Sequence, residues 1–288
     1  MARPCRTPLT IADIPITLVT DQVLPMDEAF APFTRRSGGA RYTARFRETA
    51  VLPPIPEKVL WEGPCDRFHP DGSGGWLRSF FDAPRSREPY AVGRYEYAHG
   101  YIQVDYLARG RRCVCDLNNT FFHLGLEALL CQEGKFCLHA ACVTTERGAL
   151  LCAGPSGRGK STQAELWCRH QGGRLLNGDR PILGQKQGRW TAWGSPYAGS
   201  SRCYRSDSAP IAAILVLEPW GPCQIRRLPL GEAFRRIYAL LTMYSWDGRF
   251  TAAALDFAAA LAADVPVYAY QCTADAASPA FLAASLEV

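Results

Sequence analysis

The chain has 288 residues and a formal net charge of +5, with 48% hydrophobic and 20% charged residues. This length allows one or two domains with buried cores, and the composition excludes a wholly disordered chain. The basic residues do not gather into a stripe, so the sequence does not predict a nucleic-acid-binding surface.

The first part of the chain is rich in predicted strands. Short runs of β-branched and aromatic residues, several of them alternating apolar and polar, are typical of strands, and clusters of glycine and proline separate them. Tyr95 and Tyr101 flank a turn at 98–100, which predicts a hairpin. We therefore expect a small β-rich domain over residues 1–117. Its predicted strands cover residues 14–19, 42–46, 90–95, 101–106 and 111–117.

From residue 118 onward, predicted helices and strands alternate. Asn118-Asn119-Thr120 can cap a first helix, and each following apolar run has either the period of a helix or the length of a buried strand. This alternation predicts an α/β domain over residues 118–288. The predicted helices cover 121–130, 162–170, 230–243, 251–262 and 279–286, and the predicted strands cover 136–143, 149–153, 174–176, 182–183, 189–193, 211–218 and 265–271.

Residues 154–161 fit the phosphate-binding loop pattern G-x-x-x-x-G-K-[ST], also called Walker A. The pattern lies between a predicted strand and a predicted helix, where backbone N–H groups can surround phosphates at a helix N-terminus. Lys160 would reach the outer phosphates, and the Ser161 hydroxyl would ligate Mg²⁺. A glycine-rich turn with an incidental lysine is the alternative. The candidate nucleotide-binding residues are Gly154, Ser156, Gly157, Arg158, Gly159, Lys160, Ser161 and Thr162.

Two further side chains are candidates for the chemistry at this loop. Asp179 follows a short predicted strand, so it would leave the sheet at the edge where the loop lies and would hold Mg²⁺ or orient the attacking group. A turn without a catalytic role is the alternative. His139 precedes the loop strand, and a hairpin between the two strands would turn its imidazole toward the phosphates. A packed core histidine is the alternative there.

The segment 194–202 contains small residues and ends in a guanidinium group. Ser200, Ser201 and Arg202 could clamp a phosphate or an acceptor. An ordinary surface loop is the alternative, because glycine, serine and proline are common in loops.

Three landmarks together resemble the HPr kinase/phosphorylase family, which shares its fold with ATP-dependent phosphoenolpyruvate carboxykinases. They are Leu138-His139-Ala140, the Gly-x-Ser-Gly-x-Gly-Lys-Ser loop at 154–161, and Asn177-Gly178-Asp179. The resemblance covers about residues 118–220. It implies an α/β fold with a P-loop core behind a β-rich N-terminal domain, and ATP bound at the loop. It also implies a carboxylate that assists transfer to a serine hydroxyl, and it supports a role for His139.

One position departs from the pattern of the family, which places two consecutive aspartates where this chain has Asp179-Arg180. Either Asp179 does a single job, or a carboxylate from elsewhere, such as Glu165, Asp207 or Glu218, completes the set. Arg180 could instead pair with a phosphate or a substrate carboxylate. The change argues against HPr itself as the acceptor and leaves nucleotide binding untouched.

We therefore expect an ATP-dependent kinase, a transferase that phosphorylates a hydroxyl of a peptide, a protein or a small molecule with ATP and Mg²⁺ as cofactors. Ser161 and Asp179 would hold the metal, with Asp179 ordering it or taking the acceptor proton, and His139 or Arg202 would support the developing charge. The alternative, favoured by Arg180, is a non-catalytic ATP-binding regulatory or peptide-maturation accessory protein. A GTP-driven switch ranks below both, because the chain lacks an Asn-Lys-x-Asp motif.

Cysteine usage and hydropathy bear on location. The N-terminus lacks a long apolar segment of the secretory kind, and no apolar run approaches the ~20 residues that span a bilayer. Cys113 and Cys115 lie on a predicted strand without a second pair at zinc spacing, and other cysteines fall inside apolar strands. We expect free thiols in a soluble cytoplasmic protein with no membrane or nucleic-acid partner. The oligomeric state stays open, a homo-oligomer included.

Overall fold

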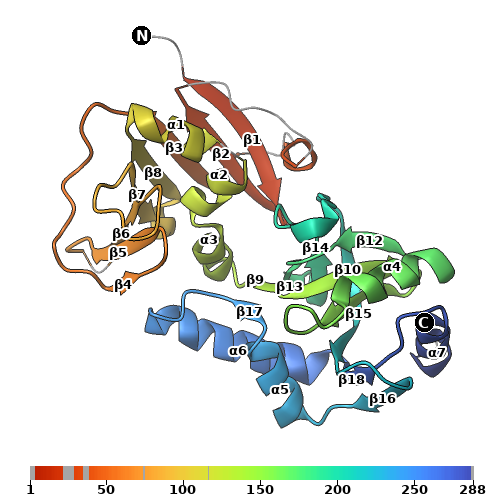
Figure 1. Cartoon of the computed structure of the whole chain (residues 1–288). Helices are drawn as coiled ribbons and strands as arrows, with labels where there is room; N and C mark the ends of the chain where they lie inside the picture. Colours follow the sequence, from red (N-terminus) through yellow and green to blue (C-terminus); the bar gives the residue numbers. More distant parts are fainter. Residues whose placement is uncertain (1–3, 22–28, 35–38, 74, 116, 287–288) are drawn as a thin grey trace. The chain divides into compact units, whose positions relative to one another are not determined.

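The computed structural model describes residues 4–21, 29–34, 39–73, 75–115 and 117–286. The chain divides into two compact units, Met1–Leu129 and Leu130–Val288, and each unit is organised around one mixed β-sheet (Figure 1). The mixed α/β class that the sequence predicts is therefore confirmed.

The first unit contains an eight-stranded sheet among its described residues, in the order β1-β2-β3-β8-β7-β6-β5-β4. β3 runs parallel to both β2 and β8, and the remaining neighbours are antiparallel, including the predicted hairpin of β7 and β8. The strands are β1 (Cys5–Ile11), β2 (Ile14–Thr20), β3 (Tyr42–Glu48), β4 (Trp61–Glu62), β5 (Asp66–Pro70), β6 (Trp76–Phe80), β7 (Ala91–Glu96) and β8 (Tyr101–Tyr106).

The strand predicted over residues 111–117 is wrong, because this stretch is helical. Three helices follow β8: α1 (Arg111–Cys115), α2 (Leu117–Leu124) and α3 (Leu126–Gln132). The Thr120 hydroxyl donates to the carbonyl of Val114 and ties the first two together. Gly125, with a φ of +64°, separates α2 from α3, so the single predicted helix over 121–130 is two helices.

Helix α2 packs within the first unit, and this moves the boundary between the units. The ring of Phe121 stacks on that of Phe30 with centroids 5.6 Å apart, and Tyr95 Oη donates to the carbonyl of His123 over 2.7 Å. The division therefore falls after Leu129, whereas the sequence suggested a boundary after residue 117.

A buried cation lies in the core of the first unit. Arg78 is 1% exposed, and its Nε donates to Asp66 Oδ2 over 2.7 Å. Its Nη1 donates to the carbonyl of Phe122, whose ring lies 3.9 Å from the guanidinium carbon. A charge is tolerated in such a place only when it is paired and hydrogen-bonded, so this cluster ties β5, β6 and α2 together.

The second unit contains a ten-stranded sheet among its described residues. Eight strands follow the order β12-β10-β11-β15-β14-β13-β9-β17, and β18 pairs with both β15 and β16. β15 runs parallel to β11 and to β18, and the other pairs are antiparallel. The strands are β9 (Phe136–Leu138), β10 (Ala140–Thr145), β11 (Gly148–Ala153), β12 (Arg174–Asn177), β13 (Ile182–Lys186), β14 (Arg189–Trp193), β15 (Ser208–Leu217), β16 (Gln224–Arg227), β17 (Leu241–Thr242) and β18 (Val267–Gln271).

Helices cover both faces of this sheet. Side chains of α4 (Lys160–His170) and α7 (Ala277–Leu286) share one apolar cluster with Leu150 and Cys152 of β11. Side chains of α5 (Leu230–Tyr238) and α6 (Gly248–Asp264) share another with Leu151 and Ala153. A strand buried on both faces carries an unbroken apolar run, which explains the composition of β11.

Two predicted elements of the second unit differ from the observed ones. The predicted strand 136–143 breaks at His139 into β9 and β10, and the predicted helix 230–243 ends at Tyr238 before the short strand β17. Both differences have one cause, because β17 pairs with β9 and the His139 N–H donates to the carbonyl of Leu240.

The cysteines of the strands are packing residues. Cys137, Cys142 and Cys152 are buried free thiols, as predicted, and burial raises the pKa of Cys272 to about 11. Cys113 lies in α1 instead of a strand, and the side chain of Cys115 lies outside the described residues.

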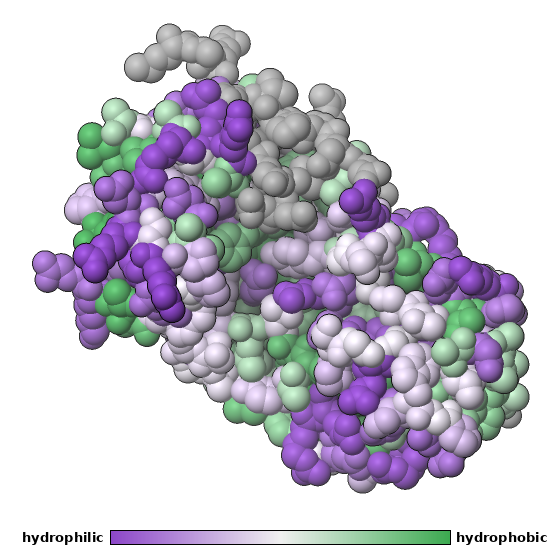
Figure 2. Space-filling view, viewed as in Figure 1, coloured by the Kyte–Doolittle hydropathy of each residue, from purple (hydrophilic) through white to green (hydrophobic). Residues whose placement is uncertain are grey.

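The described helices include none with the length and apolar character needed to cross a membrane. In the view of Figure 2, hydrophilic residues are spread over the surface among smaller apolar areas.

Candidate functional site

The glycine loop joins the end of β11 to the first residue of α4. Gly157 and Gly159 have φ values of +78° and +91°, in the left-handed region that favours glycine. Lys160 is the first residue of the helix, so the loop residues and the helix N-terminus face the same space. The sequence pattern has therefore folded into the strand–loop–helix arrangement that presents N–H groups to an anion.

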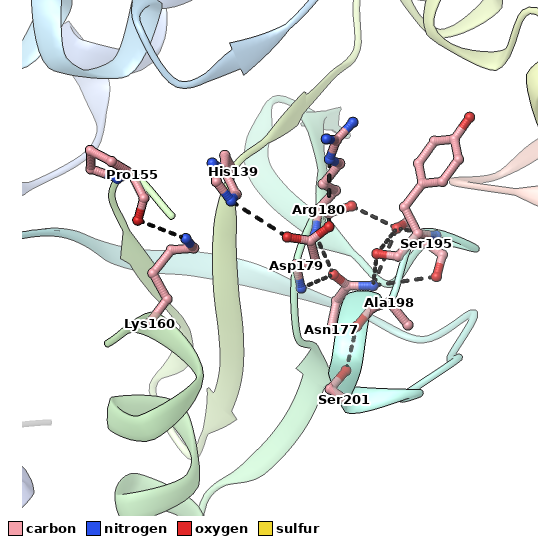
Figure 3. Close-up of polar contacts among 10 residues, drawn as sticks. His139, Pro155, Lys160, Asn177, Asp179, Arg180, Ser195, Ala198 and Ser201 are labelled. Carbon is pink, nitrogen blue, oxygen red and sulfur yellow. Dashed lines mark hydrogen bonds and ion pairs between the residues drawn. The ribbon is translucent and has the colours of Figure 1, made fainter. Parts of the chain in front are cut away.

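Lys160 lies under this loop. Its residue is 8% exposed, and its Nζ donates to the carbonyl of Pro155 over 3.1 Å (Figure 3). Burial lowers the pKa of Lys160, and the charge of Asp179 opposes this effect. The side chain is thus held beside the loop and within electrostatic reach of the carboxylate.

His139 lies at the break between β9 and β10, and its backbone connects the loop to the sheet. Its carbonyl accepts from the N–H of Gly154 over 3.3 Å, and its Nε2 lies 3.5 Å from Asp179 Oδ1 (Figure 3). Burial lowers the pKa of His139, Lys160 and Arg180 lower it further, and Asp179 opposes them. A neutral imidazole therefore faces the carboxylate at neutral pH.

Asp179 is positioned by a fully buried side chain, that of Asn177. The Oδ1 atom of Asn177 accepts from the N–H groups of Asp179 and Arg180, over 3.0 and 2.7 Å. Its Nδ2 donates to Ser195 Oγ and to the carbonyl of Tyr197, both over 3.2 Å. One amide thus joins the turn that carries the carboxylate to the segment after β14.

That segment packs closely against Asp179. A Cβ atom on Gly199, whose φ is +55°, would lie 2.8 Å from the Cβ of Asp179, and a Cβ on Gly178 would overlap the hydroxyl of Ser201. The Ser201 hydroxyl in turn donates to the carbonyl of Ala198 over 2.6 Å. Glycine at 178 and 199 therefore permits the close approach that fixes the carboxylate.

The segments described above surround a pocket of about 360 Å³ that is open to solvent. The pocket brings together most of the predicted site residues, from the β9–β10 break, the loop with α4, the turn after β12 and the segment after β14. Its lining residues are His139, Ser156, Gly157, Gly159, Lys160, Ser161, Thr162, Gly178, Asp179 and Ser200.

A second pocket of about 380 Å³ adjoins it and shares Ser161, Gly178 and Ser200. Beyond the shared residues it is lined by Glu165, Cys168, Leu175 and Ser201. The main pocket therefore continues along α4 toward β12.

Four predicted residues do not line the main pocket. Ser201 lines only the adjoining one. Gly154 is buried at the base of the loop, and Arg158 is half-buried with its stem against Gly154. Arg202 is exposed and has a φ of +49°.

The pocket lining contains one carboxylate among the described residues, that of Asp179. Its second oxygen, Oδ2, lies 3.5 Å from Nε of Arg180, so Arg180 flanks the carboxylate from the next position in the chain. The other candidate carboxylates form ion pairs outside the main pocket: Glu165 with Arg169, Asp207 with Arg174, and Glu218 with Arg236. Glu165 also lines the adjoining pocket.

The residues present fit a Mg²⁺ ion held between protein and phosphates. Ser161 offers a hydroxyl and Asp179 a carboxylate in the same pocket, and Mg²⁺ prefers oxygen ligands while keeping waters and substrate phosphates. An all-protein cage is a different arrangement, and among the described residues no group of three or more His, Cys, Asp or Glu side chains is placed to form one.

The sequence predicts the loop and Asp179 as site residues but not the residues that support them. Asn177 belongs to the Asn177-Gly178-Asp179 landmark, and an Asn-Gly-Asp turn is a signal for this kind of side-chain bond. The contacts of Ser195 and Gly199 depend on how distant strands pair, and no local pattern indicates them.

Comparison with known proteins gives a partial structural similarity. No family model and no curated protein matches the chain. A solved structure of the HPr(Ser) kinase/phosphatase from Coxiella burnetii is similar to 32% of this chain and 76% of its own, with 15% sequence identity and a TM-score of 0.25.

Proposed function

We propose that this protein is a Mg-ATP-dependent phosphotransferase that phosphorylates a hydroxyl group. The observation that carries the proposal is one pocket in which a glycine loop and Lys160 meet Asp179 and a neutral His139. The first two groups suit a triphosphate, and the last two suit the proton of an attacking hydroxyl.

Phosphate binding falls to the loop. The N–H groups around residues 156–162 would contact the phosphates, and Lys160 Nζ would turn from the Pro155 carbonyl to the outer phosphates. Ser161 would hold Mg²⁺, which when bound neutralises charge on the β- and γ-phosphates, and Asp179 is assigned the acceptor proton in place of a metal-holding role.

Phosphoryl transfer then needs a group that accepts a proton. The acceptor oxygen forms a bond to the γ-phosphorus, the bond from that phosphorus to the bridging oxygen breaks, and the hydroxyl proton passes to Asp179. His139 lies 3.5 Å from Asp179 Oδ1 and, being neutral, can share or relay that proton. Arg180 flanks the other oxygen and restrains the carboxylate.

The adjoining pocket along α4 is the proposed place of the acceptor, because it opens from the same Ser161, Gly178 and Ser200. Its size suits the end of a peptide side chain or a small molecule. Arg202, exposed at the end of the neighbouring segment, is proposed to contact an acceptor or its phosphate.

A second candidate function is an ATP-binding regulatory or accessory protein without transfer. It is favoured by Arg180, which stands beside Asp179 in the place of a second carboxylate.

The test combines ligand-induced stabilisation with turnover. We expect Mg-ATP to raise the unfolding temperature of the wild-type protein, and Lys160→Ala to abolish this shift because the outer-phosphate contact is lost. Lys186→Ala, at an exposed lysine of β13, is the matched control and should keep the shift.

Transfer of γ-labelled phosphate by the wild-type protein to a serine peptide or a small alcohol supports the kinase. A full thermal shift with neither transfer nor hydrolysis supports the regulatory alternative. The absence of any shift in the wild-type protein contradicts both.

A further inference from the structure

Trp220 is a large exposed aromatic residue beside the glycine loop. It follows β15 in the connection to β16, and 45% of its surface is exposed. Its six-membered ring lies so close to Gly159 that a Cβ atom at that glycine would overlap it. The ring therefore covers the backbone of the loop while remaining open to solvent.

The order of the strands places this ring and the reactive groups on opposite flanks of the loop. In the sheet, β11 has β10 and then β12 on one side and β15 on the other. Asp179 follows β12, and Trp220 follows β15. Because β11 and β15 are parallel, their carboxyl ends emerge at the same edge, so the ring stands beside the phosphate-binding N–H groups.

We propose that Trp220 is the platform on which the base of a bound nucleoside triphosphate stacks. This inference rests on the proposed nucleotide-binding function. A triphosphate whose terminal phosphorus lies at Asp179 must direct its nucleoside away from that flank, and the β15 flank carries the exposed ring. Stacking on an aromatic side chain tolerates different bases, so the platform selects nucleotides over inorganic phosphates more strongly than one base over another.

The experiment compares a complete nucleotide with its phosphate part alone. Binding of ATP and of inorganic tripolyphosphate, each with Mg²⁺, is measured by calorimetry for the wild type, Trp220→Ala and Trp220→Phe. Loss of one stacked base should weaken the affinity of Trp220→Ala for ATP about 10-fold. The affinity of the same variant for tripolyphosphate should stay within about 2-fold of the wild-type value. The affinity of Trp220→Phe for ATP should stay within about 3-fold of the wild-type value, because a smaller aromatic face remains.

Leu230→Ala is the matched control, since Leu230 is another exposed apolar residue of the same unit and should not alter either affinity. Unfolding without ligand checks that each variant is folded. Equal weakening of ATP and tripolyphosphate in Trp220→Ala would show that the ring only braces the loop and would overturn the proposal. Unchanged ATP affinity would overturn it as well.

The outcomes also separate this proposal from the kinase proposal. Selective loss of ATP affinity in Trp220→Ala, in a protein that transfers no phosphate, supports the platform and contradicts the kinase. If the wild-type protein binds neither ligand, both proposals fall.

Discussion

The two units hold a carboxylate beside a cation in opposite ways. In the first unit, Arg78 and Asp66 are buried and meet at 2.7 Å, with the guanidinium also bound to a carbonyl and covered by aromatic rings. In the second unit, Asp179 lies 3.5 Å from both His139 and Arg180, and its side chain is 30% exposed. In the short, buried pair, the carboxylate is taken up by its protein partner. In the longer, partly exposed contacts of Asp179, the carboxylate oxygens remain accessible to a ligand.

The difference shows how the same chemical groups form a closed structural pair in one place and stay open to a ligand in another. A buried ion pair is costly to break, because removing one partner leaves an uncompensated charge. The contacts of Asp179 are long, and its backbone is held instead by the amide of Asn177. The position of Asp179 is thus fixed through its main chain, while its carboxylate stays accessible to a ligand. Four substitutions or conditions test this contrast.

The largest expected effect is on the buried pair. Arg78→Met should lower the free energy of unfolding by about 3–5 kcal/mol, because Asp66 loses its partner in the core. Arg67→Met is the control: Arg67 meets the more exposed Glu62 at the same 2.7 Å, and its loss should cost about 1 kcal/mol or less. Denaturant unfolding measures both, and similar costs would contradict the contrast.

Asp179→Asn tests the available carboxylate. We expect turnover to fall by at least about 100-fold, because the proton acceptor is lost, while ATP affinity changes by less than about 3-fold. Steady-state kinetics and calorimetry give the two quantities. Parallel loss of both, or a loss of folding stability as large as that of Arg78→Met, would mean that Asp179 is a structural residue.

Gly199→Ala tests the close packing behind Asp179. The added methyl group would press on the Asp179 side chain, so turnover should fall about 10-fold, and the left-handed backbone should cost about 1 kcal/mol of stability. Gly134→Ala is the matched control, with a φ of +62° and no atom within 4 Å of the added carbon. It should show the same stability loss with normal turnover, and equal turnover in the two variants would argue against this positioning.

The smallest effect concerns pH. Burial lowers the pKa of both His139 and His69 below the ordinary value of 6.5, so each is neutral in the folded protein near neutral pH. Unfolded histidine binds a proton more readily, so the stability contribution is full above pH 6.5 and is lost as the pH falls through the folded pKa. Calorimetry should therefore show a falling unfolding temperature on acidification.

Substitution separates the two histidines. His139→Gln should reduce this acid sensitivity with little change in unfolding temperature above neutral pH. His69→Gln should also lower the unfolding temperature above neutral pH, because the His69 ring contacts Ser79 Oγ at 2.9 Å and the Lys58 carbonyl at 3.1 Å. An unchanged acid sensitivity in both variants would contradict the assignment.

The parts of the fold that the sequence predicted well are those with strong local signals. The β11–loop–α4 unit follows from an unbroken apolar strand, glycines at left-handed positions and a helix with a buried stripe. The β13–β14 hairpin follows from a turn between two short strands. Here, local preference and the final structure agree.

The predictions failed where distant pairing decides the structure. The chain after Tyr238 leaves the helix because β17 pairs with β9, which lies about a hundred residues earlier. Residues 111–115 belong to a stretch with the composition of a strand, yet they form a helix with Val114 buried. At the site, the positions of Ser195, Gly199 and Trp220 follow from the order of the strands, which no local pattern reveals.

The side chain of Asn177 makes hydrogen bonds both to the turn at Asp179 and to the segment after β14, so the two segments are held rigidly together. Ser195 Oγ also donates to the carbonyl of Arg180 over 2.6 Å, so each of the two segments donates a side-chain hydrogen bond to the other. Exchanging the whole segment would therefore displace Asp179, whereas altering only the exposed tip at Ser200 and Arg202 would leave these hydrogen bonds intact. Variants that test the proposed acceptor site should begin at that tip.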